Sequence, residues 1–249
     1  MLRTHRVSVA IALVLAASLA ASASAAAAEP PASVRYQLGL LSRGAAWTAE
    51  KSAHTDSIQV GHMANIGRMA ARGALVAAGP FAGDGDLRGL FVFAPDADSL
   101  PELLAGDPAI ASGRLECRLA TWVAPAGLGD EYRQRRAALG REGEGMPDSM
   151  VSFGWVMLHR GPRYDSRPTP AVEKLIREHF EYTEKLRAQG KLVYAGAIEG
   201  TGELRGVLVM EGDSAAVAHA IKDDPAVKAG RFTSSILRWW TAWGTIPGH

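Results

Sequence analysis

The sequence repeats itself from Tyr36 onward, and this repeat limits the folds that the chain can adopt. Identical residues recur at a constant offset of 117 positions, with no insertion or deletion between the two copies. The matched pairs include His62 with His179, Arg43-Gly44 with Arg160-Gly161, Leu75-Val76 with Leu192-Val193, Leu87-Arg88-Gly89 with Leu204-Arg205-Gly206, Asp107-Pro108-Ala109 with Asp224-Pro225-Ala226, Gly113-Arg114 with Gly230-Arg231, and Trp122 with Trp239. Solenoid arrays use shorter periods and at least three copies, so two copies of this length indicate a duplicated module.

Each copy shows the same order of predicted elements. A short apolar strand comes first, at 36–41 and 153–158, and a helix that carries the repeated histidine follows it. Two strands at 75–81 and 87–94 are joined by a glycine- and aspartate-rich turn, and short helices are expected at 100–105 and 215–221. Final strands are expected at 115–123 and 232–240. This βαββαβ order is typical of a ferredoxin-like α+β module, in which both helices cover one face of an antiparallel sheet.

The uncovered face of such a sheet would be apolar in this chain. Trp122, Trp155, Trp239 and Phe153 fall on it, and exposed apolar patches of that size are uncommon on monomers. We therefore expect the two copies to pack sheet to sheet as a single-chain, pseudo-dimeric α+β barrel. The predicted parts are modules at 34–123 and 152–243, a linker at 124–151 with a short, charged, solvated helix, and a tail at 244–249.

The first 28 residues predict a secretory signal peptide. Arg3 and Arg6 form a basic start, 7–21 is apolar, and small-x-small cleavage patterns occur at 21–23 and 23–25. The apolar stretch is shorter than the roughly 20 residues of a membrane-spanning helix. We expect an exported protein, periplasmic or secreted, without a stable membrane anchor; the alternative is an uncleaved N-terminal anchor.

Charge and cysteine content exclude several classes of function. The formal net charge is +1 and no long basic run is present, so nucleic acid is not an expected partner. A single cysteine, Cys117, excludes an intramolecular disulfide and a cysteine-based metal cluster. The expected partner is a small-molecule ligand or substrate, and assembly into a homo-oligomer is left open.

An ionisable side chain lies twice on the apolar stripe of a predicted helix. His62 is a helical turn from both Ile58 and Ile66, and His179 comes three residues after Ile176. A histidine in such a position is either a hydrogen-bonded core residue or part of a site. Its repetition favours the site.

The helix histidine, the AGPF sequence at 78–81 and the Asp-Pro pair before the last strand resemble the YCII-related (YciI-like) domain family. The resemblance extends over most of both copies and implies the dimeric α+β barrel. It also implies a His–Asp pair in each copy, His62 with Asp107 and His179 with Asp224. Some members of the family act as lyases or dehalogenating enzymes on hydroxylated aromatic compounds.

A carboxylate partner holds a histidine in one tautomer and favours its charged form, which suits proton transfer near neutral pH. The hypothesis is that His179, oriented by Asp224, moves a proton next to a carbonyl or phenol, with His62 and Asp107 equivalent or degenerate. The second copy is expected to hold the better-preserved site. Predicted substrate-binding residues are the matched arginines, which could hold a carboxylate or enolate oxygen, and one aromatic wall: Arg88, Arg205, Arg114, Arg231 and Tyr194.

Each of these residues also has a structural interpretation. An aspartate followed by proline is typical of a helix N-cap, and arginines at strand ends commonly form salt bridges. No metal site is predicted, because the remaining histidines lack companions at ligand spacing. Three functions stay open: a lyase or isomerase without a tightly bound cofactor, a non-catalytic binding module for an apolar ligand that is aromatic or carboxylate-bearing, and a haem-binding barrel with His62 or His179 as axial ligand.

Overall fold

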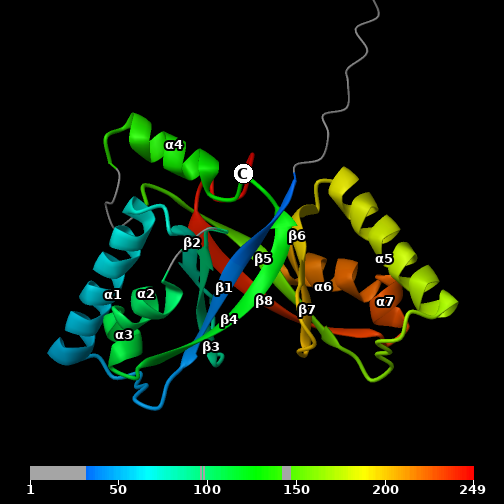
Figure 1. Ribbon diagram of the computed structural model, residues 1–249, viewed down its shortest axis with the longest axis horizontal. Coiled ribbons are helices and arrows are strands. Elements are labelled where there is room, and N and C mark those ends of the chain that lie inside the picture. The colour runs from blue at the N-terminus through cyan, green and yellow to red at the C-terminus, as the bar shows by residue number, and fades with distance from the viewer. Residues whose placement is uncertain (1–31, 96, 98, 142–146) are drawn as a thin grey trace, which may run out of the picture. The chain divides into compact units, whose positions relative to one another are not determined.

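Each copy of the repeat folds as a four-stranded antiparallel sheet with helices on its outer face (Figure 1). The computed structural model describes residues 32–95, 97, 99–141 and 147–249. The first copy comprises β1 (Ser33–Arg43), α1 (Ala53–Ala71), β2 (Leu75–Pro80), β3 (Leu87–Phe93), α2 (Leu100–Ala105), α3 (Pro108–Ala111) and β4 (Leu115–Pro125). The second comprises β5 (Met150–Arg160), α5 (Pro170–Ala188), β6 (Leu192–Ile198), β7 (Leu204–Met210), α6 (Ser214–Lys222), α7 (Pro225–Lys228) and β8 (Phe232–Ala242). The first and last strands of each copy are longer than predicted, and α3 and α7 start where the sequence predicted only a cap.

The strands of both copies form one eight-stranded sheet that curls into a nearly closed barrel. The strand order is β2-β3-β1-β4-β6-β7-β5-β8, so the copies meet where β4 pairs with β6, at Trp122 and Ile198. The open ends of the sheet meet at an isolated bridge between Phe81 and Trp239. These two seams are related by the same offset as the sequence repeat, which gives the barrel a pseudo-twofold axis. The α+β barrel is confirmed, with the halves joined edge to edge along the seams as well as through a shared interior.

The interior of the barrel is filled by the tryptophans that were expected on the inner faces. Trp122, Trp155 and Trp239 are fully buried, and Trp155 contacts the other two edge-on, with ring centroids 5.6 and 5.1 Å apart. Successive strand residues point to opposite faces, so these side chains point inward while the alternate residues meet the helices. Large aromatic side chains bury much apolar surface, which stabilises the union of the two halves.

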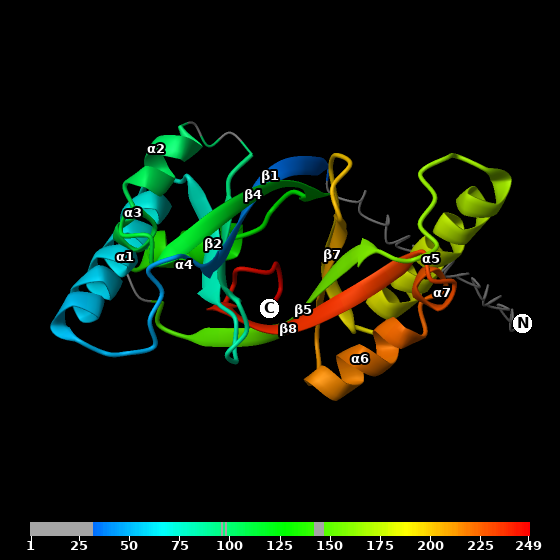
Figure 2. The same ribbon diagram turned by 90° about the horizontal axis from the view of Figure 1, so that it is seen from below.

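The histidine helices begin and end at recognisable signals. Ser52 caps α1 in a capping box with Thr55, and the Thr169 side chain accepts from the Val172 N–H at the start of α5. Gly73 and Gly190 follow the two helices with φ of +72° and +69°, a backbone conformation that favours glycine. In the turned view of Figure 2, α1 to α3 and α5 to α7 lie on opposite outer sides of the strands.

The linker and the chain end add cover to the first copy. Helix α4 (Asp130–Ala138) starts where the Gly129 N–H donates to the Thr245 carbonyl at 2.8 Å. Ile246 is fully buried against the barrel core, so the predicted tail packs against the fold. Figure 1 shows α4 on the side of the barrel that carries α1. Among the described residues, no equivalent helix follows β8 at the end of the second copy.

The predicted signal peptide lies outside the described residues. The described residues from Ala32 to His249 belong to one compact unit. None of the helices in the described part of the chain is long and apolar enough to cross a membrane.

Candidate functional site

His62 and Asp107 are in contact in the first copy. His62 lies on the inner face of α1, and its Nδ1 is 2.9 Å from both carboxylate oxygens of Asp107. Asp107 is the N-cap of α3, where its Oδ1 accepts from the Ala109 N–H at 2.9 Å. The cap and the histidine pair, which the sequence allowed together, coexist in one carboxylate. Burial alone would raise the pKa of Asp107, but the hydrogen bond and charge of His62, with bonds from Asn65 and Ala109, lower it below its ordinary value.

Asn65 is a site residue that the sequence reasoning missed. Its Nδ2 donates to Asp107 Oδ2 at 3.1 Å, and it is buried. The available signal was its position three residues after His62, which places both side chains on one helix face. The corresponding residue of the second copy is Tyr182, whose hydroxyl donates to the Ala220 carbonyl at 2.8 Å. Asn65 thus belongs to the first site alone.

The second copy repeats the pair beside a different aromatic ring. His179 Nδ1 is 2.6 Å from Asp224 Oδ2, and Asp224 Oδ1 accepts from the Ala226 N–H at 2.8 Å. The His179 ring meets Phe232 edge-on, with centroids 5.7 Å apart. The first copy has the smaller Leu115 in place of Phe232. Phe232 therefore fills space beside the second histidine.

A cavity of about 610 Å³ lies beside His62. Its wall combines α1, β2, β3 and the start of β4 with residues outside the repeat, including Tyr132 of α4 and Thr245 near the chain end. Most of the wall is apolar, and it includes His62, Met63, Phe91, Trp47, Arg88 and Arg114. Phe91 also stacks on His62, with ring centroids 5.8 Å apart. The geometry thus favours the first copy as the ligand site, whereas the sequence pointed to the second.

The predicted arginines gather on one aromatic ring in each copy. The guanidinium carbons of Arg88 and Arg114 lie 5.1 and 4.6 Å from the Trp47 ring centroid. Those of Arg205 and Arg231 lie 5.9 and 4.6 Å from the Tyr164 ring centroid. The sequence did not single out the two aromatic rings, although the offset of the repeat places them at equivalent positions.

Tyr194 lies away from this cavity, inside the barrel. Its hydroxyl donates to the Pro125 carbonyl, and its ring meets Trp122 edge-on with centroids 5.5 Å apart. Burial is the main reason that the pKa of Tyr194 is well above its ordinary value. The predicted ligand wall at this position is a core residue of the barrel.

Metal and thiol chemistry find little support in the described residues. No three His, Cys, Asp or Glu side chains converge there to hold a metal ion. Cys117 is half-buried on β4, and burial, with a smaller effect from the Asp107 charge, raises the pKa of its thiol to about 11. A thiol of that pKa is almost wholly protonated at neutral pH and is a poor nucleophile.

The chain was compared with solved structures, with curated protein sequences and with models of protein families. Structures with partial similarity include a provisionally assigned chlorite dismutase (11% identity, 86% of this chain and 96% of that one, TM-score 0.49). They also include a heme-binding protein from Thermus thermophilus (15% identity, 87% and 96%, TM-score 0.49) and a siroheme decarboxylase (10% identity, 84% and 75%, TM-score 0.42). Similarities this low say nothing about activity or ligand. No curated protein sequence matches the chain significantly. Residues 155–241 match the YCII-related domain, and the chain therefore carries a YCII-related domain in its second half.

Proposed function

We propose that the protein is a small-molecule enzyme of the lyase or isomerase type, in which His62 transfers a proton to or from a ligand held in the cavity of the first copy. One observation carries the proposal: a buried histidine, held by a carboxylate through one ring nitrogen, lines a cavity of about 610 Å³. Cavities of several hundred Å³ with mostly apolar walls and a few polar groups are typical of small-molecule sites.

The pair sets the roles of the two ring nitrogens. An ionised carboxylate only accepts hydrogen bonds, so the Nδ1 of His62 must carry the hydrogen that it donates to Asp107. In the neutral ring Nε2 is then the acceptor, and it is the nitrogen left for the ligand. An Nε2 that accepts a proton from a carbon or hydroxyl acts as a general base, and a positioned base of this kind contributes about 10²- to 10⁴-fold in rate.

Hydrogen–deuterium exchange tests proton transfer even when the reaction product is unidentified. The purified protein is incubated in D₂O with a panel of carbonyl compounds and phenols, binding is measured by calorimetry, and exchange at carbon is followed by NMR. We expect at least one bound compound to exchange, and His62→Gln to slow its exchange at least 100-fold while binding changes little.

His179→Gln is the matched control, because it alters the same pair in the copy without this cavity. Its exchange rate should stay within twofold of the unchanged protein. Bound compounds that never exchange, or exchange that survives His62→Gln, would overturn the catalytic role. The absence of binding by every compound would overturn the assignment of the cavity.

The second candidate function is a binding module without catalysis. One observation favours it: His179 and Asp224 make the same buried contact outside the lining of the described cavity, so the pair can serve the fold alone. Under this alternative, compounds bind beside His62 but do not exchange, and His62→Gln changes affinity or stability only.

Export is part of the proposal and rests on the sequence of the first 28 residues alone. Mass spectrometry of protein recovered from outside the cytoplasm tests it. A mature N-terminus between Ala23 and Ala28 is expected, and an intact Met1 would refute it.

A further inference from the structure

Three arginines of the first copy surround one tryptophan ring. The guanidinium carbons of Arg43, Arg88 and Arg114 lie 5.2, 5.1 and 4.6 Å from the centroid of Trp47. They come from the end of β1, the start of β3 and the loop before β4, segments that the sheet brings together at one end. The Trp47 ring and two of these arginines also line the cavity beside His62.

These arginines have no acidic partner among the described residues. None of the ion pairs within 4.0 Å includes Arg43, Arg88 or Arg114. Arg43 and Arg88 donate to backbone carbonyls of the β2–β3 turn, at Asp84 and Gly83, with distances of 2.9 and 2.7 Å. Carbonyl acceptors satisfy N–H groups but leave the positive charge uncompensated.

Two N–H groups of the cluster are buried and unpaired. Arg43 Nε and Arg114 Nη1 are inaccessible to solvent and lack an acceptor. A buried donor without an acceptor costs free energy, and the cost is larger for a charged group. An anion between the guanidinium groups would supply acceptors and charge together, and arginine forks match the geometry of carboxylate and phosphate groups.

The second copy has an equivalent cluster, in which Arg160 Nε and Arg231 Nε are likewise buried and unpaired. Arg160, Arg205 and Arg231 lie 4.7, 5.9 and 4.6 Å from the Tyr164 ring centroid. Asp165 follows this tyrosine, and Arg231 Nη1 donates to its carbonyl at 2.6 Å. Hydrogen bonds from Arg167, with a smaller effect from the charge of Arg231, lower the pKa of Asp165 to about 2, so its carboxylate is ionised. This carboxylate pairs with Arg167 at 2.8 Å, and none of the ion pairs in the described part of the chain joins it to the three clustered arginines.

The first copy has Thr48 at the position of Asp165. It also has Leu115 where Phe232 lies under Arg231, with that guanidinium carbon 5.6 Å from the Phe232 ring centroid. The described cavity separates the two copies, since Trp47, Arg88 and Arg114 line it and Arg205 and Arg231 do not.

We propose that Arg43, Arg88 and Arg114, gathered on Trp47, form an oxyanion-binding site in the wall of the His62 cavity, which holds a carboxylate or phosphate group of an otherwise apolar ligand. The inference rests on the proposed function for the location of the ligand and adds its chemical class. The apolar wall around Met63 and Phe91 receives the ligand body while the arginines fix its charged end.

Paired probes test the charge requirement. Benzoate, phenyl phosphate and neutral benzamide are titrated into the purified protein by calorimetry at low salt. We expect one or both anions to bind at least tenfold more tightly than benzamide and to lose affinity as salt is raised. The ranking of the two anions identifies which oxyanion the site prefers.

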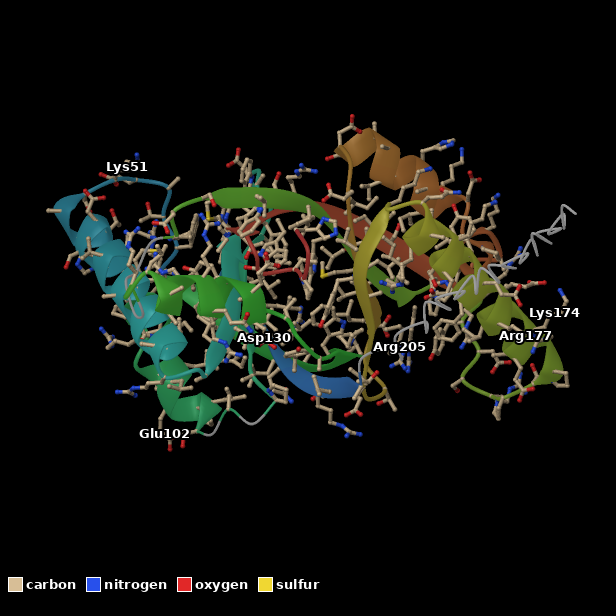
Figure 3. The ribbon with its side chains drawn as sticks, turned by 90° about the horizontal axis from the view of Figure 1, so that it is seen from above. Lys51, Glu102, Asp130, Lys174, Arg177 and Arg205 are labelled. Carbon is tan, nitrogen blue, oxygen red and sulfur yellow. The ribbon has the colours of Figure 1, made fainter. Side chains whose placement is uncertain are left out.

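Arg88→Gln and Arg205→Gln are a matched pair of variants, because both arginines occupy the same position and donate to the equivalent turn carbonyl. Figure 3 labels Arg205 near the start of β7. Arg88→Gln should weaken anion binding at least tenfold and leave benzamide unchanged, whereas Arg205→Gln should change neither. Arg114→Gln, which removes a like charge, should behave as Arg88→Gln does while the fold stays intact by circular dichroism.

The oxyanion site would be overturned by equal affinity for benzoate, phenyl phosphate and benzamide, or by no binding of any of them. Equal effects of Arg88→Gln and Arg205→Gln would also overturn it. His62→Gln separates the two proposals. Anion affinity that survives His62→Gln while no bound compound exchanges supports the oxyanion site and refutes proton transfer. Exchange that needs His62 but not Arg88 supports proton transfer and refutes the oxyanion site.

Discussion

Replacing Asp107 by asparagine separates the two tasks of this carboxylate. Asparagine is as good an N-cap as aspartate, so its side-chain oxygen can still accept from the Ala109 N–H. Its amide nitrogen, however, is a donor and can no longer accept from His62 Nδ1. The neutral histidine then prefers the opposite tautomer, with its hydrogen on Nε2. The nitrogen left for the ligand changes from an acceptor to a donor.

The size of the effect follows from the contacts that change. Asp107→Ala removes a cap worth about 1 kcal/mol and charge-assisted hydrogen bonds worth about 1.5–3 kcal/mol, so a loss of about 2.5–4 kcal/mol is expected. Asp107→Asn keeps the cap and mismatches the donors of His62 and Asn65, which should cost about 1–2 kcal/mol. The asparagine variant therefore stays folded, and its proton-transfer rate should still fall about 10²- to 10⁴-fold.

Three measurements decide the outcome. Urea unfolding gives the free energy of unfolding, NMR of ¹⁵N-labelled histidine reports the tautomer, and deuterium exchange reports activity. Asp224→Asn is the matched control, and it should lose similar stability without loss of exchange. A His62 ring that carries its hydrogen on Nε2 in the unchanged protein, or full activity in Asp107→Asn, would refute the reasoning.

Three further predictions concern stability and reactivity. The pKa of Asp107 is lower in the folded protein than in the unfolded chain. The ionised carboxylate therefore stabilises the fold above the unfolded pKa of about 3.9, and this stabilisation is lost as pH falls through the folded pKa. Acid unfolding of Asp107→Asn should depend less on pH below about 4, and acid-unfolding curves identical to those of the unchanged protein would contradict this. A Cβ at Gly79 would lie 1.7 Å from the Trp240 carbonyl oxygen at the barrel seam, so Gly79→Ala should lower the free energy of unfolding by about 3 kcal/mol or more. Gly85 faces open space, so Gly85→Ala should change the free energy of unfolding by less than about 1 kcal/mol. Both values are measured by urea unfolding, and equal effects would show that the seam tolerates movement. At pH 8 only about one Cys117 thiol in a thousand is ionised, given a pKa of about 11, so iodoacetamide should modify it far more slowly than the same thiol in urea; equal rates would place this thiol in solvent.

The fold was accessible from the sequence because its signals are local and doubled. The repeat, the glycine after each histidine helix and the Asp-Pro caps each reflect a backbone requirement, and a duplicated module with one apolar sheet face has few ways to bury it. The contact of His62 with Asp107 was accessible for a different reason, since it followed from the family resemblance.

The asymmetry of the two sites was not accessible in the same way. The cavity beside His62 depends on Tyr132 and Thr245, which lie outside the repeat and reach the first copy only through the tertiary fold. The exchange of Leu115 for Phe232 is a conservative change in the sequence, and its effect appears only when the ring is seen against His179. Trp47 was missed because a single aromatic residue in a loop gives no periodic signal.

The joining of both halves in one polypeptide has a consequence for evolution. In a dimer of separate identical chains, every substitution occurs on both sides of the axis, so no position can change on one side alone. Here one copy can carry Phe232 beside its histidine while the other carries Leu115 at the same position. Covalent linkage also makes assembly independent of protein concentration, so one half can serve as a permanent scaffold while its twin is free to specialise.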